Sequence, residues 1–163
     1  MPLQFSLTAL PALLTGALLL GASLAHASDE QEDVTLQPMK LSYNASLDKG
    51  ISLNGDARRI LEQRDDGTWH FRTDVDSFVA DIDESLIFRW EDNQVVPLRY
   101  RYKLSGLFIR DREEAIDFDW ENNVVSGHHE GDKFSMKLEK GAMDPMGYQL
   151  QLSQDIKAGK REM

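Results

Sequence analysis

Along most of the chain, apolar and polar residues alternate one by one, and this period of two constrains the fold more than any other feature. The clearest example is residues 116–121, where Ile, Phe and Trp alternate with Asp, Asp and Glu. Successive side chains of a β-strand point to opposite faces of the sheet, so such a segment has one apolar and one charged face. The pattern recurs over residues 39–48, 69–76, 86–90, 96–104 and 134–139. The sequence therefore predicts successive antiparallel strands with one face on a core.

Turn-forming residues separate these segments. They are Lys49-Gly50, Asp65-Asp66-Gly67, Asp92-Asn93, Asn122-Asn123 and Gly131-Asp132. Each is short enough to connect two neighbouring strands as a hairpin. The apolar parity changes between Ala57 and Ile60, which predicts a β-bulge near Gly55. Pro97 is expected near the start of its strand, where a missing N–H is least harmful.

The last part of the chain departs from the strand pattern. Asp144 followed by Pro145 is typical of a helix N-cap and first turn. Met146, Leu150 and Ile156 are expected to face a sheet from a short helix. The predicted fold class is therefore mainly β: a curved, half-barrel-like antiparallel sheet with one C-terminal helix. A sheet of these strands alone would leave an edge unpaired, which natural sheets usually protect.

The N-terminal segment predicts export. No charged residue lies between Phe5 and Leu24, and Ala25-His26-Ala27 gives the small-x-small pattern of a cleavage site. This is the layout of a signal peptide over residues 1–27, although no Lys or Arg precedes the apolar run. An uncleaved membrane anchor is the alternative, but a proline and two glycines interrupt the run. We expect cleavage, a periplasmic location and no stable membrane anchor afterwards.

Two further segments are expected after cleavage. Residues 28–37 are polar and predict a flexible leader, and residues 38–163 predict a β-rich domain. The chain contains no cysteine, so disulfides, a lipid-acceptor thiol and thiolate metal sites are impossible. Its net charge of −10 argues against nucleic acid and anionic headgroups as bulk partners.

Two groups of polar residues are candidate sites, and both favour a structural interpretation. His128 and His129, near Glu130 and Asp132, suggest a metal site, but neighbouring strand residues point to opposite faces. Asp117, Asp119 and Glu121 share one strand face at a spacing that resembles paired glycosidase carboxylates. Pairing with the basic row of the preceding strand is the favoured role. That row is Arg99, Arg101 and Lys103.

Leu107, Phe108 and Ile109 precede the mixed charge run of residues 110–114. These three residues suit either an exposed loop that touches lipid or a partner, or the start of a strand in the core. The core is favoured, because exposed apolar triplets are uncommon on monomers. We find no nucleophile motif, phosphate loop or dinucleotide fingerprint, so neither an enzyme nor a bound cofactor is expected.

Several residues occur together in the order and spacing of a known family. They are Tyr43 with Gly50 and Gly55, Pro97-Leu98-Arg99-Tyr100, Phe118-Asp119-Trp120, and Gly141 leading to Asp144 and Gln149-Leu150. On these residues, over 39–159, the chain resembles the DUF3108 family of exported bacterial proteins. The resemblance implies the N-terminal part of a longer β-rich domain, and it carries no agreed activity and no catalytic residues that could be assigned to this chain. As a fold-level analogy, it looks like carriers of lipoproteins or lipids in the periplasm.

Aromatic residues of one parity provide the leading functional hypothesis, which is non-catalytic binding of a hydrophobic or amphipathic envelope ligand on the concave sheet face. The candidate ligand-binding residues are Trp69, Phe71, Phe88, Trp90, Tyr100, Tyr102, Phe118 and Trp120. The alternative is an assembly or structural factor that binds another envelope protein through an open sheet edge. A hydrolase that uses Asp117 and Asp119 is the third hypothesis.

Overall fold

The computed structural model describes residues 35–48 and 52–160, and only the backbone of 45–48 and 52–54. The predicted signal peptide, most of the predicted leader and the turn at Lys49-Gly50 lie outside these residues. No helix in the described part of the chain is long and apolar enough to span a membrane.

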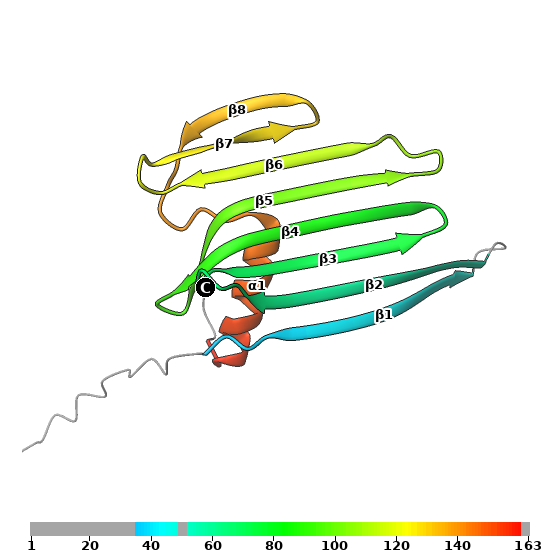
Figure 1. Cartoon of the computed structure of the whole chain (residues 1–163), viewed down its shortest axis with the longest axis horizontal. Helices are drawn as coiled ribbons and strands as arrows, with labels where there is room; N and C mark the ends of the chain where they lie inside the picture. Colours follow the sequence, from blue (N-terminus) through cyan, green and yellow to red (C-terminus); the bar gives the residue numbers. More distant parts are fainter. Residues whose placement is uncertain (1–34, 49–51, 161–163) are drawn as a thin grey trace, which may run out of the picture. The chain divides into compact units, whose positions relative to one another are not determined.

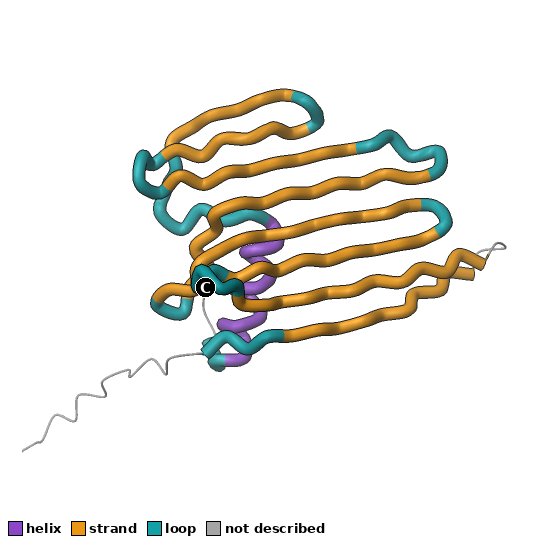
Figure 2. The backbone as a smooth tube through the Cα atoms, viewed as in Figure 1, coloured by secondary structure: helices purple, strands orange, loops and turns teal. Residues whose placement is uncertain are grey.

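The described residues form one antiparallel sheet whose strands follow the order of the chain (Figures 1 and 2). Its strands are β1 (Met39–Asp48), β2 (Ser52–Gln63), β3 (Trp69–Ser77), β4 (Ala80–Glu91), β5 (Gln94–Gly106), β6 (Arg112–Asp119), β7 (Val124–His129) and β8 (Asp132–Lys137). One helix, α1 (Pro145–Lys157), follows them. The sheet is not closed, since β1 pairs only with β2 and β8 only with β7. The predicted fold class is therefore confirmed.

The four predicted turns that lie within the described residues join their strands as hairpins. Asp92 and Asn93 both have positive φ, at 50° and 58°, as a two-residue type I′ turn requires. Gly67, Asn123 and Gly131 also have positive φ in the turns between their strands. Asn, Asp and Gly tolerate this left-handed backbone better than other residues, so these turns could be found from the sequence.

The predicted β-bulge near Gly55 is wrong. The pairing of β2 with β1 and with β3 runs through Gly55 without interruption, so no bulge lies there. Ile60 faces away from the core, opposite Arg72, and this alone produced the apparent change of parity. The register shifts instead between Ile87 and Phe88, where β4 pairs with β5.

This shift also changes which residues at the start of β5 face the core. Val95 is 3% exposed and pairs with Trp90, whereas Val96 lies opposite the exposed Arg89. The alternation over residues 96–104 predicts that Val96 points inward with Tyr100 and Tyr102, and this prediction is therefore wrong. Pro97 lies near the start of the strand as expected, and it is fully buried opposite Phe88.

Helix α1 begins where the sequence predicts. The Asp144 carboxylate accepts hydrogen bonds from the backbone N–H groups of Met146 and Gly147, both at 2.9 Å. Met146 and Leu150 are buried against the sheet as predicted, but Ile156 is 65% exposed, so its predicted inward position is wrong. Gln154 takes that place, because residues at i, i+4 and i+8 share one helix side.

The core lies between α1 and one face of the sheet, which we call the helix face; the opposite face is the outer face. Its buried residues are Leu36, Leu61, Trp69, Phe71, Leu86, Phe88, Val95, Tyr100, Met146 and Leu150. Helix α1 runs across the strands, close to the end of the sheet where β2 turns into β3 and β4 into β5 (Figure 1). The parts of β2 to β5 nearer their other end extend beyond the helix (Figure 1).

Candidate functional site

Most of the predicted aromatic binding residues are part of the core. Five of them are buried, with exposed fractions of 8% or less: Trp69, Phe71, Phe88, Tyr100 and Phe118. Trp90 and Tyr102 are half-buried and pack against the same cluster. Trp120 stacks on Phe118 with ring centroids 6.4 Å apart and donates a hydrogen bond to the Pro97 carbonyl. Stabilising the fold is thus the role that these contacts support directly.

Beyond α1, polar side chains cross the helix face in register. Arg59, Thr73, Glu84, Tyr102 and Glu114 lie side by side on β2 to β6, and we call them the polar row. All five are half-buried. They therefore present polar atoms next to the apolar core without being fully hydrated.

Contacts with the core and the helix hold the polar row in place. The Arg59 guanidinium lies 4.9 Å from the centre of the Phe71 ring and donates to Thr73 at 3.2 Å and to Gln149 of α1 at 2.9 Å. Glu84 accepts a 2.9 Å hydrogen bond from the Tyr100 hydroxyl. Burial, together with this bond, raises the pKa of Tyr100, so the hydroxyl stays a donor.

The next positions along the same strands are apolar. Ala57, Val75, Ile82 and Leu104 lie side by side on β2 to β5, and we call them the apolar row. All four are half-buried, and Tyr43 of the edge strand, which pairs with Ala57, is 51% exposed. The apolar row lies two residues farther from α1 than the polar row. An amphipathic surface therefore extends over the part of the helix face that the helix leaves open.

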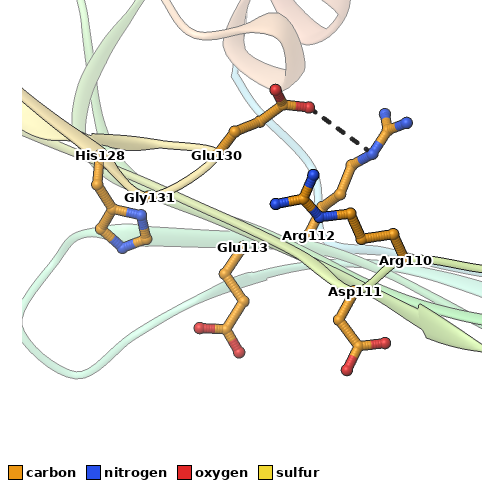
Figure 3. Close-up of a pocket in the computed structure, with 7 residues that line it drawn as sticks. All are labelled: Arg110, Asp111, Arg112, Glu113, His128, Glu130 and Gly131. Atoms are coloured by element: carbon orange, nitrogen blue, oxygen red, sulfur yellow. Dashed lines mark ion pairs between the residues drawn. The ribbon is translucent and has the colours of Figure 1, made fainter.

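A small pocket of mixed charge lies where the β5–β6 loop and the start of β6 meet the end of β7 and its turn into β8. Figure 3 shows the residues that line it. It has a volume of about 350 Å³, and the residues that line it are Arg110, Asp111, Arg112, Glu113, His128, Glu130 and Gly131. Arg112 and Glu130 form an ion pair at 3.8 Å across it. Because both signs of charge line the pocket, its electrostatics favour neither an anion nor a cation.

The two neighbouring histidines of β7 lie in different surroundings. His128 is half-buried and lines the pocket, whereas His129 is exposed and its Nδ1 lies 3.0 Å from a Glu114 carboxylate oxygen. Within residues 35–48 and 52–160, no three His, Asp or Glu side chains are grouped to hold a metal ion.

The carboxylates of β6 have the partners expected of a structural charged face. Asp117 pairs with Arg101 at 2.8 Å and with Arg99 at 3.4 Å, as the sequence predicts. Lys103 pairs instead with Glu113, at 3.7 Å. Asp119 does not pair with the basic row as predicted. It accepts hydrogen bonds from the backbone and the side chain of Asn122 instead, and these bonds lower its pKa. Asp117 thus forms a cross-strand ion pair, and Asp119 stabilises the turn between β6 and β7.

The structure also corrects the predicted position of the three apolar residues in the β5–β6 loop. Leu107, Phe108 and Ile109 are 49%, 99% and 37% exposed, so the predicted core position is wrong. The loop leaves the sheet at Gly106 and turns through a left-handed backbone at Phe108, with φ 63°. Sequence reasoning also missed Phe78, which is 80% exposed in the β3–β4 turn. The sequence does contain a signal for this turn, since the alternation of apolar and polar residues is interrupted over Ser77–Ala80, between two alternating segments.

No protein-family model, curated protein or solved structure matches the chain. The resemblance to the DUF3108 family therefore stays a prediction.

Proposed function

We propose that the protein is a non-catalytic binding protein of the bacterial envelope, and that its ligand is an amphipathic molecule such as a lipid. The observation that carries this proposal is the apolar row beside the polar row on the open part of the helix face. Hydrocarbon is stabilised on the apolar row by about 25 cal/mol for each Å² removed from water. A polar headgroup finds hydrogen-bonding partners in the neighbouring row, including Thr73 and Glu84.

The location of the site differs from that expected from aromatic parity alone. Phe71, Phe88 and Tyr100 are already buried beneath α1, so the ligand contacts Tyr102 and the apolar row instead. The apolar run of residues 5–24 and the following Ala-x-Ala support a periplasmic location. Envelope lipids are the amphipathic molecules available in that compartment.

Binding can be tested with a pair of matched variants on one strand. Ile82 lies on the open helix face of β4, whereas Ile87 of the same strand lies on the outer face, and both are half-buried. The purified protein is titrated with a fluorescent fatty acid. Ile82→Gln should weaken binding about tenfold, by the lost burial of one large aliphatic side chain, and Ile87→Gln should leave it unchanged. Equal effects of both substitutions, or no saturable binding by the unsubstituted chain, would reject the site.

The open edges of the sheet support the alternative, an assembly factor that adds a partner strand. Within the described residues, β1 and β8 each have one unpaired side. However, β8 carries Lys133 and Lys137 and β1 carries Lys40, and lysines on edge strands discourage strand addition. Cross-linking in living cells separates the hypotheses: a carrier should trap lipid through position 82, and an assembly factor one defined protein through position 40 or 133.

A further inference from the structure

Two neighbouring loops at the end of the sheet away from α1 expose large apolar side chains. The β3–β4 turn contributes the exposed Phe78 next to the half-buried Val79, and the β5–β6 loop contributes the exposed Leu107, Phe108 and Ile109. We call these five residues the apolar tip. Phe108 is 99% and Phe78 80% exposed, values far from those usual for phenylalanine in a folded chain. Neither side chain contributes to the core, so their exposure needs another explanation.

The backbone of the apolar tip is held in place. The Leu107 N–H donates to the Val79 carbonyl at 3.0 Å, which joins the two loops directly. Gly106 allows this approach, because a Cβ there would lie 2.3 Å from the same carbonyl oxygen. Within the β3–β4 turn, Ser77 Oγ donates to the Ala80 carbonyl at 2.7 Å and accepts from the Ala80 N–H at 3.0 Å. The two loops therefore present their apolar side chains as one unit.

The size of the apolar tip decides which partner suits it. A phenylalanine can bury about 150–250 Å², so two of them with parts of Leu107 and Ile109 offer roughly half of the 800 Å² that each side of a stable protein interface buries. A second copy of the chain or another protein would need more surface than this. A lipid bilayer needs no complementary surface, and the strength of interfacial binding scales with the apolar area that is buried, so a small apolar tip supports weak binding.

The charges around the apolar tip determine which class of lipid headgroup it can approach. The apolar tip itself carries no charge, and the next residues, Arg110 and Asp111, are of opposite sign. Asp81 lies near the other loop, where its carboxylate accepts from the Ser77 N–H at 3.4 Å. The whole chain carries −10. An anionic bilayer would repel such a protein, while a zwitterionic one would not.

We propose that the apolar tip is a membrane-docking element that inserts Phe78 and Phe108 into the interface of a zwitterionic lipid bilayer. This contact is reversible, because a few side chains bind far more weakly than a membrane-spanning helix. It places the apolar row, which lies between the apolar tip and α1 on β4 and β5, next to the bilayer surface. The proposal does not depend on the ligand site, since docking needs only the two loops.

The chain contains no cysteine, so a polarity-sensitive dye can be attached at single chosen positions. Phe108→Cys and Phe78→Cys carry the dye at the apolar tip, and Tyr148→Cys, on the exposed side of α1 at 58% exposure, is the control. On phosphatidylcholine vesicles, the dye at positions 78 and 108 should shift to shorter emission wavelength and that at 148 should not. A shift of equal size at all three positions, or at none, would overturn the proposal.

Co-sedimentation of the full chain with the same vesicles gives the affinity. Phe108→Ser should lower the partition coefficient about tenfold or more, as expected from removing one buried aromatic side chain, and Tyr148→Ser should not change it. Replacing part of the phosphatidylcholine with phosphatidylglycerol should weaken binding. Binding that is strengthened by phosphatidylglycerol, or is unaffected by Phe108→Ser, would contradict insertion of the apolar tip. The proposal would also be contradicted if the protein did not bind vesicles and instead formed a complex with another protein through Phe108.

Discussion

Replacing Asp144 with alanine should remove the acceptor that holds the first turn of α1 on the sheet. Its carboxylate is 1% exposed and accepts from the N–H groups of Met146 and Gly147. Loss of an N-cap costs about 0.5–2 kcal/mol, and a donor left buried without a partner costs about 1–3 kcal/mol. We expect Asp144→Ala to lower the free energy of unfolding by about 3 kcal/mol, or Tm by roughly 10 °C.

Asparagine at the same position separates the role of the acceptor from that of the charge. Burial raises the pKa of Asp144 above its usual value, although the hydrogen bonds from Gly147 and Met146 oppose this. The folded protein therefore keeps this proton to a higher pH than the unfolded chain does. The stabilisation is complete below the unfolded pKa and is lost as the pH rises through the folded pKa.

Asp144→Asn keeps an acceptor oxygen and cannot ionise. Relative to Asp144→Asn, the unsubstituted protein should be less stable when assayed at about pH 8 than at about pH 4, by about 1.4 kcal/mol for each unit by which folding raises the pKa of Asp144. Urea titrations followed by tryptophan fluorescence measure both effects, since Trp69 is buried in the core. If Asp144→Ala were as stable as the unsubstituted chain, or Asp144→Asn as unstable as Asp144→Ala at both pH values, this reasoning would be refuted.

Phe88→Ala should lower the free energy of unfolding in urea by about 3–5 kcal/mol, because Phe88 is fully buried, whereas Phe78→Ala should change it by less than about 0.5 kcal/mol. Gly127→Ala places a Cβ 1.8 Å from the Ala115 carbonyl oxygen, so hydrogen exchange should accelerate across β6 to β8. Arg101→Met removes an ion pair whose side chains are 40% and 48% exposed, and thermal unfolding should show a change below about 1 kcal/mol. A larger change would show that the hydrogen bonds from Arg101 to the Tyr100 and Ile116 carbonyls also stabilise the fold.

The strands could be predicted because their residues follow the period of the pleat, as residues 116–119 of β6 do. Errors arose where several registers satisfy the same pattern. Val95, Val96 and Leu98 are all apolar, so the sequence cannot tell which of them faces the core after the shift at Phe88. A single apolar residue on the outer face, Ile60, suggested a bulge that the pairing does not contain.

The candidate site was harder to predict than the strands. Parity identified the helix-facing aromatic residues correctly as one face, but it carries no information on which of them the helix covers. The burial predicted for Leu107, Phe108 and Ile109 was wrong for a different reason. Apolar residues are usually buried because burial removes their surface from water, and a loop that exposes three of them contradicts this preference. Where such a preference fails, a functional surface is the natural explanation.

The direction of α1 determines where the open surfaces of the helix face lie. A helix with its side chains is about 10–12 Å across, and a strand rises about 3.3 Å per residue, so a helix laid across a sheet covers three or four residues of each strand. Strands β2 to β5 are 9 to 13 residues long. Along β4 the order is accordingly Phe88 and Leu86 under the helix, then Glu84, Ile82 and the turn at Phe78. A longer α1 could not cover Ile82, because extra helical residues extend it across more strands rather than along them. The amphipathic surface therefore stays open as long as α1 crosses the strands. A thiol introduced by Ile82→Cys should react faster with a water-soluble thiol reagent than one introduced by Leu86→Cys, and equal rates would indicate a second covering element.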